Sequence, residues 1–87
     1  MTTIKVIVTA ESGLHARPAN LFVKTATKFA SSIRVSKGDK EVDGKRLLAL
    51  MTLGAKKGDS ICIHADGIDE KEAIKKLKAL FDTNFKE

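Results

Sequence analysis

His15 is the residue whose type and position in this sequence best support chemistry. It lies in the segment Gly13-Leu14-His15-Ala16-Arg17-Pro18, where a glycine-containing loop enters a predicted helix. The N-terminus of a helix presents free backbone N–H groups and a partial positive charge, which disfavour a protonated imidazole. A neutral ring nitrogen there can accept a phosphoryl group, whose oxygens the N–H groups can then bind.

Two cations follow His15 at spacings that suit such a group. Arg17 can reach phosphate oxygens with its forked guanidinium, and Lys24 adds positive potential one or two turns further along. In the alternative interpretation His15 caps the helix and Arg17 is solvated, although histidine is not a favoured N-cap residue. Spacing alone leaves both interpretations open. The chemistry the segment could support unaided is receiving and releasing a phosphoryl group.

The other reactive residues do not form a second centre in the sequence. Neither a Walker loop nor a GxGxxG element is present, and no Ser-His-Asp or Cys-His triad can be argued. Cys62 and His64 alternate on a predicted strand but are too few to hold a metal. We therefore expect no metal and no cofactor. A single cysteine cannot form an internal disulfide and fits a reducing, cytoplasmic location.

Alternating and helical patterns predict the elements that must position His15. Alternation predicts strands at residues 3–9, 32–36, 40–43 and 60–65. Helical spacing predicts helices at about 16–28, 46–53 and 69–82. The first helix carries one apolar stripe, made of Ala19, Phe22, Val23, Ala26, Phe29 and Ala30.

Turn and cap residues separate these elements. Lys37-Gly38-Asp39 predicts a turn, Gly54 stands where a helix C′ glycine is expected, and Asp69 with Glu72 has the spacing of a capping box. The element order is β-α-β-β-α-β-α. Because each strand has one apolar and one mostly polar face, we expect an α+β fold in which helices cover one side of an antiparallel sheet, an open-faced two-layer sandwich.

Length and composition bound the possible functions. The 87 residues suffice for one domain, spanning 1–87, and a hydrophobic content of 43% argues against disorder. No apolar run approaches the roughly 20 residues of a membrane span, so we expect no membrane insertion. Sixteen Lys and Arg against eleven Asp and Glu give a net charge of +5, which suggests nucleic acid as an alternative partner.

The predicted open face of the sheet argues against that alternative. Domains that bind single-stranded RNA on a sheet stack the bases on aromatic side chains. The predicted face has no aromatic residue; it carries Lys5, Ile7, Arg34, Cys62 and His64. We therefore expect no nucleic-acid partner.

The segment Gly13-Leu14-His15-Ala16-Arg17-Pro18-Ala19 resembles the HPr family of the bacterial phosphotransferase system. The resemblance covers essentially the whole chain, including residues 45–54, Ala65-Asp66-Gly67 and residues 69–73. It implies a four-stranded sheet of order 1-4-2-3 with three helices on one side. It also implies a monomeric phosphocarrier, not an enzyme.

The same resemblance assigns roles to residues. His15 would receive the phosphoryl group on Nδ1 from enzyme I, which draws it from phosphoenolpyruvate, and pass it to a histidine of an enzyme IIA domain in sugar uptake. Arg17 would help hold the phosphate. The partner-docking surface would include Asn20, Lys24, Leu47, Leu48 and Met51.

Composition supports part of that surface. The predicted helix at 46–53 has more apolar residues than one buried stripe requires, so some of them should be exposed: Leu47, Leu48, Leu50, Met51 and Leu53. Exposed aliphatic and Met side chains suit a surface that binds several partners. The alternative is that all five are core.

Two features depart from the sugar-transport pattern. Many family members carry a regulatory serine after the lysine equivalent to Lys45, whereas this chain has Arg46. Arg46 could contact an acidic partner or be solvated. Residues 49–53 and the tail 84–87 are similar to the nitrogen-related type, NPr, which serves a regulatory phosphorelay. A further alternative is a regulatory binding module in which His15 only caps a helix.

Overall fold

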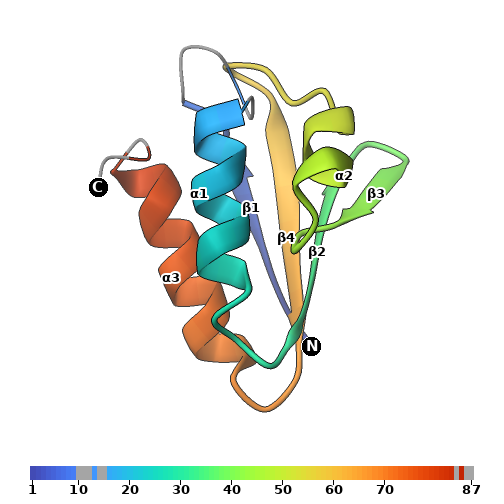
Figure 1. The fold of residues 1–87 in the computed structure, drawn as a ribbon. Coiled ribbons are helices and arrows are strands. Elements are labelled where there is room, and N and C mark those ends of the chain that lie inside the picture. The colour runs from blue at the N-terminus through green and yellow to red at the C-terminus, as the bar shows by residue number, and fades with distance from the viewer. Residues whose placement is uncertain (10–12, 14–15, 84, 86–87) are drawn as a thin grey trace.

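The four strands form one antiparallel sheet in the order β1-β4-β2-β3 (Figure 1). The computed structural model describes residues 1–9, 13, 16–83 and 85. The strands are β1 (Thr2–Ile7), β2 (Ser32–Lys37), β3 (Lys40–Asp43) and β4 (Ser60–Asp66). The element order, the antiparallel sheet and its 1-4-2-3 strand order are confirmed.

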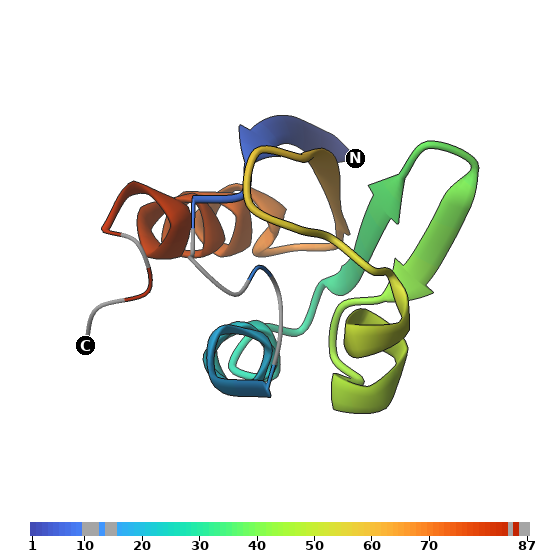
Figure 2. The ribbon, with the colours of Figure 1, turned by 90° about the horizontal axis from the view of Figure 1, so that it is seen from above.

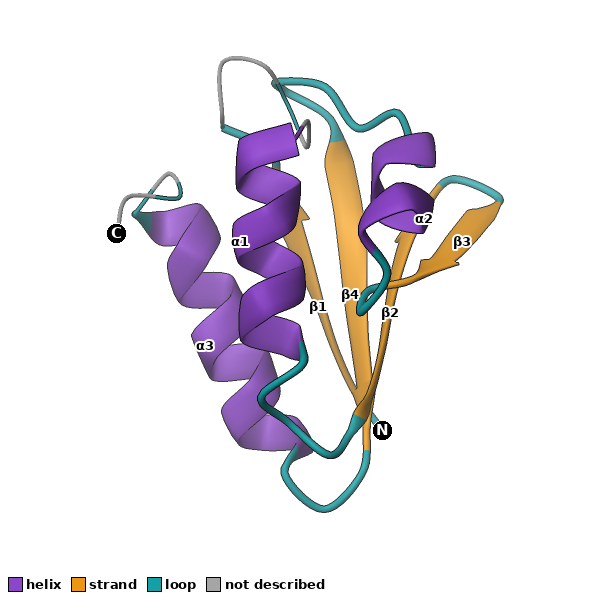
Figure 3. Ribbon diagram, viewed as in Figure 1, coloured by secondary structure: helices purple, strands orange, loops and turns teal. Residues whose placement is uncertain are grey.

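Helices α1 (Ala16–Ala26), α2 (Leu47–Thr52) and α3 (Glu70–Asp82) lie on one side of the sheet (Figure 3). The sheet's inward residues and the buried stripes of the helices form one core. Phe22 of α1 and Phe81 of α3 meet there edge to face, with ring centroids 6.2 Å apart. The predicted open-faced sandwich of α+β class is confirmed.

The predicted strand at residues 3–9 ends early, at Ile7. Val8 is still buried, and its N–H donates to the carbonyl of Asp59 at 2.9 Å. Its own carbonyl accepts from the N–H of Gly58 at 2.8 Å. Because these partners belong to the turn before β4, the pairing continues while the regular ladder stops.

The first helix is shorter than the predicted 16–28. It ends at Ala26, and the N–H of Phe29 donates to the Ala26 carbonyl in a turn that follows it. Phe29 still packs against the core, but Ala30 is exposed. The prediction of Ala30 in the apolar stripe was wrong because the chain has left the helix by that residue.

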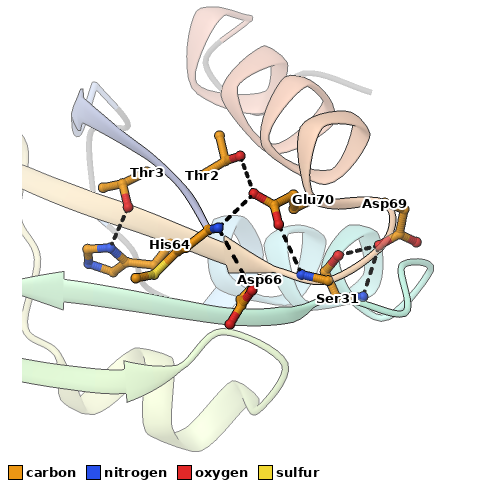
Figure 4. Close-up of polar contacts among 9 residues, drawn as sticks. Thr2, Thr3, Ser31, His64, Asp66, Asp69 and Glu70 are labelled. Carbon is orange, nitrogen blue, oxygen red and sulfur yellow. Dashed lines mark hydrogen bonds and ion pairs between the residues drawn. The ribbon is translucent and has the colours of Figure 1, made fainter.

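The capping box predicted for the last helix was also wrong. Asp69 occupies the N-cap position, but its carboxylate makes no bond to its own helix. It accepts instead from the N–H of Ala30 at 2.8 Å, from the N–H of Ser31 at 2.9 Å, and from the Ser31 hydroxyl (Figure 4 shows the two from Ser31). A loop 38 residues away in sequence therefore takes the acceptor that a local pattern had assigned to the helix.

The elements that matter for the site lie at the end of the molecule opposite to Asp69. The start of α1, the end of α2 and the turn between β2 and β3 all lie at the upper end in Figure 1. Seen from above, the segment that follows α2 crosses this end to reach β4 (Figure 2).

Candidate functional site

His15 lies outside the described residues, but Gly13 and Ala16 on either side of it are placed. Gly13 is buried and has a φ of +70°, a conformation that favours glycine. A Cβ atom at Gly13 would lie 2.3 Å from the carbonyl oxygen of Ala55 and 2.9 Å from the Cα of Lys56. The glycine before His15 therefore lies directly against the segment after α2.

The exposed face of α1 presents the polar residues predicted from the sequence. Arg17, Asn20 and Lys24 are all exposed, and their spacing places them on one face of the helix. All residues of α1 are described, and its first turn has no acidic side chain. The start of α1 therefore combines free N–H groups with the Arg17 guanidinium, and its first turn carries no carboxylate to repel an anion.

Helix α2 divides its apolar residues between the core and the surface. Leu50 and Leu53 are buried, Leu47 and Met51 are half-buried, and Leu48 is 78% exposed. The alternative that all five apolar residues are core is therefore wrong for Leu48. The expectation that some of these residues are exposed is confirmed by Leu48. Helix α2 packs beside α1 (Figure 2).

Side chains outside α2 fasten its start. Asp43 accepts from the N–H of Lys45 at 2.9 Å and pairs with Arg46 at 3.6 Å. The ammonium group of Lys45 donates a hydrogen bond to the carbonyl of Phe29 at 2.7 Å. Arg46 stands at the N-cap position with its side chain 78% exposed, so it remains available to solvent or a partner.

Two lysines of the β2–β3 hairpin fasten the other end of α2. Lys40 donates to the carbonyl of Thr52, and Lys37 donates to the carbonyl of Gly54 at 3.0 Å. Lys37 also forms an ion pair with Asp59 at 2.9 Å. Sequence reasoning assigned Lys37 only to a turn and gave Asp59 no partner, because no local pattern connects residues so far apart.

Asp59 links this lysine to the backbone of the same segment. Its carboxylate accepts from the N–H of Lys56 at 2.8 Å. The hydrogen bond from Lys37, followed by that from the Lys56 backbone, holds the pKa of the Asp59 carboxyl below its ordinary value. The carboxylate thus stays charged near neutral pH and keeps both contacts.

The open face of the sheet carries the polar residues predicted for it. His64 lies between two hydroxyls, with Nδ1 3.0 Å from Thr3 Oγ1 and Nε2 3.0 Å from Ser36 Oγ (Figure 4 shows the first). A surface depression of about 350 Å³ lies beside it, lined by Met1, Ser32, Arg34, Glu41, His64 and Asp66. No Phe, Tyr or Trp side chain lines it.

Among the described residues, no group of three or more His, Cys, Asp or Glu is placed to hold a metal ion. Cys62 is a free thiol on β4. None of the helices in the described part of the chain is long and apolar enough to cross a membrane.

Comparison with known proteins places this arrangement in a class. A family model described as the PTS HPr component phosphorylation site matches residues 2–83. The phosphocarrier protein HPr of Vibrio cholerae is 46% identical over 78 residues, which are 90% of this chain and 92% of that protein.

Solved structures agree with the sequence comparison. The HPr-C-His crystal structure from Thermoanaerobacter tengcongensis matches with a TM-score of 0.96 and 44% identity, covering 100% of this chain and 98% of the other. A structure of an HPr dimer from the same organism matches with a TM-score of 0.80 and 44% identity over the full length of both chains.

The fold and the comparisons thus define a small open-faced sandwich of the phosphocarrier class. The chain belongs to the HPr family of the phosphotransferase system.

Proposed function

We propose that the chain is a phosphocarrier that accepts a phosphoryl group on His15 from enzyme I and passes it to a histidine of enzyme IIA domains. Family membership supports the carrier role. The observation that carries the site is the start of α1, where Arg17 is exposed and the first turn has no acidic residue. That environment suits a doubly charged phosphoryl group.

In each transfer one bond to phosphorus replaces another. The lone pair of the His15 Nδ1 atom forms a bond to phosphorus while the bond from phosphorus to enzyme I breaks, and that electron pair stays with enzyme I. A histidine nitrogen of the IIA domain then displaces His15 in the same way. Arg17 binds the phosphoryl oxygens, so the charge that moves between proteins remains paired.

The docking surface we propose combines the exposed ridge of α1 with α2. Asn20 and Lys24 supply polar contacts, and Leu48 supplies an exposed aliphatic centre flanked by Leu47 and Met51. Mixed apolar and basic character suits partners that share an acidic rim around an apolar patch. We propose that residues 1–87 act as one cytoplasmic domain and as a monomer. Because a relative is solved as a dimer, the monomeric state needs its own test, and light scattering provides it by measuring the mass in solution.

Phosphorylation of the purified protein tests the assignment. After incubation with enzyme I and phosphoenolpyruvate, the protein should gain the mass of one phosphate, and acid should remove it. His15→Ala should gain none, whereas His64→Ala, a change on the open face, should be phosphorylated like the wild type. Phosphate on His15→Ala would refute the site.

The nitrogen-related branch is the second candidate, favoured by the sequence at residues 49–53 and in the tail. The two branches differ in the protein that accepts the phosphoryl group. Phosphorylated protein offered to IIA domains of sugar permeases and to a nitrogen-regulatory IIA domain should transfer faster to the former. Faster transfer to the latter would assign the regulatory branch instead.

A further inference from the structure

The segment that supports Gly13 has no regular secondary structure of its own. Residues 54–59 connect α2 to β4, and Gly13 lies against Ala55 and Lys56 with no room for a side chain. Any shift of the Ala55–Lys56 backbone would therefore move Gly13. Since His15 follows two residues later in the chain, the position of this segment bears on the site of the proposed phosphoryl transfer.

One lysine, Lys37, fixes the segment at both of its ends. Lys37 donates to the carbonyl of Gly54 at 3.0 Å, where the segment begins, and pairs with Asp59 at 2.9 Å, where it ends. The side chains of Lys37 and Asp59 are 34% and 33% exposed, so two thirds of each is screened from solvent. Partial burial strengthens the pair relative to a fully exposed one.

Asp59 extends the connection into the backbone beneath Gly13. Its carboxylate accepts from the Lys56 N–H at 2.8 Å, and its own N–H donates to the Lys56 carbonyl at 2.9 Å. Lys56 is therefore held through both of its backbone polar groups. The carbonyl of Asp59 also accepts from the N–H of Val8, which ties the segment to the end of β1.

We propose that Lys37 and Asp59 are positioning residues for phosphoryl transfer: together they fix residues 54–59 as the support against which Gly13, and through it the His15 loop, is placed. The inference rests on the proposed function of His15. It adds that a hairpin lysine with no expected contact to the partner or the phosphate controls the rate of transfer. Lys37 acts on geometry, so its loss should lower kcat and leave docking unchanged.

The first measurement does not depend on phosphoryl transfer. Lys37→Met should shift the Gly13 amide resonance and speed its hydrogen exchange, whereas Lys37→Arg should restore the wild-type signal because the cation is retained. Lys76→Met is the matched control, since Lys76 is an exposed lysine on α3. An unchanged Gly13 amide in Lys37→Met would overturn the proposal.

The second measurement is transfer from phosphorylated enzyme I. We expect kcat to fall roughly five- to tenfold in Lys37→Met and in Asp59→Asn, because small displacements near a reacting group cost that much or more. KM should stay within about twofold, since neither residue belongs to the proposed docking surface. The kcat of Lys37→Arg should return toward that of the wild type.

The outcomes separate the two proposals. If the wild type takes no phosphate on His15, the proposed function fails, and the Gly13 amide still decides whether Lys37 and Asp59 fix the support. If the wild type is phosphorylated and Lys37→Met keeps the kcat of Lys76→Met, the positioning role is overturned. A rise in KM at constant kcat would also overturn it, because it would show that Lys37 acts in docking.

Discussion

Gly13 and Gly54 share a backbone conformation but differ in their surroundings. Both have a φ of +70°. A Cβ at Gly13 would meet the backbone of Ala55 and Lys56, while a Cβ at Gly54 would meet nothing within 4 Å. The pair therefore separates the cost of a left-handed conformation from the cost of a displaced contact.

Gly13→Ala should impair both stability and phosphoryl transfer. The left-handed backbone conformation alone costs about 1–3 kcal/mol once a side chain is present. The added Cβ would in addition clash with Ala55 and Lys56 and push Gly13 away from them. We expect transfer from enzyme I to fall at least about tenfold. Gly54→Ala should lose only the conformational part of that stability, with little loss of transfer, because its side chain would meet no neighbour. Stability is measured by urea unfolding and transfer by the rate of phosphorylation from enzyme I. Equal transfer rates in the two variants would show that the Gly13 contact is irrelevant to the site.

Residue types were the most predictable part of the site, and long-range partners the least. His15, Arg17 and the apolar excess of the second helix stand out in the sequence because they are local patterns. The link between Lys37 and Asp59 has no such pattern, since it depends on how the β2–β3 hairpin lies over the segment after α2. The same holds for Asp69, whose partners lie in the loop after α1.

At the scale of elements, α2 is a short helix stabilised by its surroundings. Six residues are too few for independent stability, and its first turn has no acidic side chain. Burial of Leu50 and Leu53 holds it against the core, and contacts from Asp43 and Lys40 fasten its ends. Its exposed residues can therefore change without loss of the helix.

Leu48→Ser should weaken docking and leave the fold intact. Leu48 is 78% exposed, so its truncation removes little buried surface from the folded protein. In the proposed interface it would be covered, and losing an aliphatic anchor there costs about 1 kcal/mol or more. We expect KM for transfer from enzyme I to rise about fivefold, with the melting temperature unchanged.

Ile68 offers the matched control, because it is 97% exposed in the turn between β4 and α3, at the end away from α2 (Figure 1). Ile68→Ser should leave both KM and stability unchanged. If Leu48→Ser behaved in the same way as Ile68→Ser, α2 would not be the docking surface.

Pattern explains why these elements could be predicted while their ends could not. Alternation and helical spacing define the seven elements, since each must bury one face. Their ends depend on contacts outside the pattern: β1 stops where Val8 pairs with the turn at Gly58 and Asp59. Helix α1 stops at Ala26, although Phe29, three residues beyond its end, still packs against the core.

For the whole molecule, three carboxylates each join two segments that are far apart in the sequence. Asp59 joins the hairpin to the segment after α2, and Asp69 joins α3 to the loop after α1. Glu70 accepts from the Thr2 hydroxyl and pairs with the N-terminal ammonium at 3.2 Å. In each case the largest influence is a side-chain hydrogen bond, and it holds the pKa of the carboxyl below its ordinary value.

Acid should therefore destabilise the protein through these groups. A carboxyl whose pKa is lower in the folded state stabilises that state fully above its unfolded pKa, here the ordinary values of 3.8 for Asp and 4.5 for Glu. As pH falls through those values, the unfolded state binds more protons than the folded state, and stability declines. Urea unfolding should show a constant free energy from pH 7 to about 5.5 and a fall from there to pH 3.

Asp69→Asn isolates one part of that acid dependence. The Asn side chain has one acceptor oxygen and no negative charge, so it cannot replace the carboxylate that accepts three hydrogen bonds from Ala30 and Ser31. The variant should therefore be less stable than the wild type at pH 7. Because it has lost one titrating group, its stability should fall less between pH 5.5 and pH 3, and the two unfolding curves should converge in acid. Asp39→Asn, a change in the exposed turn between β2 and β3, should run parallel to the wild type. Parallel curves for Asp69→Asn would mean that the carboxylate, although bonded to the loop after α1, does not couple folding to pH.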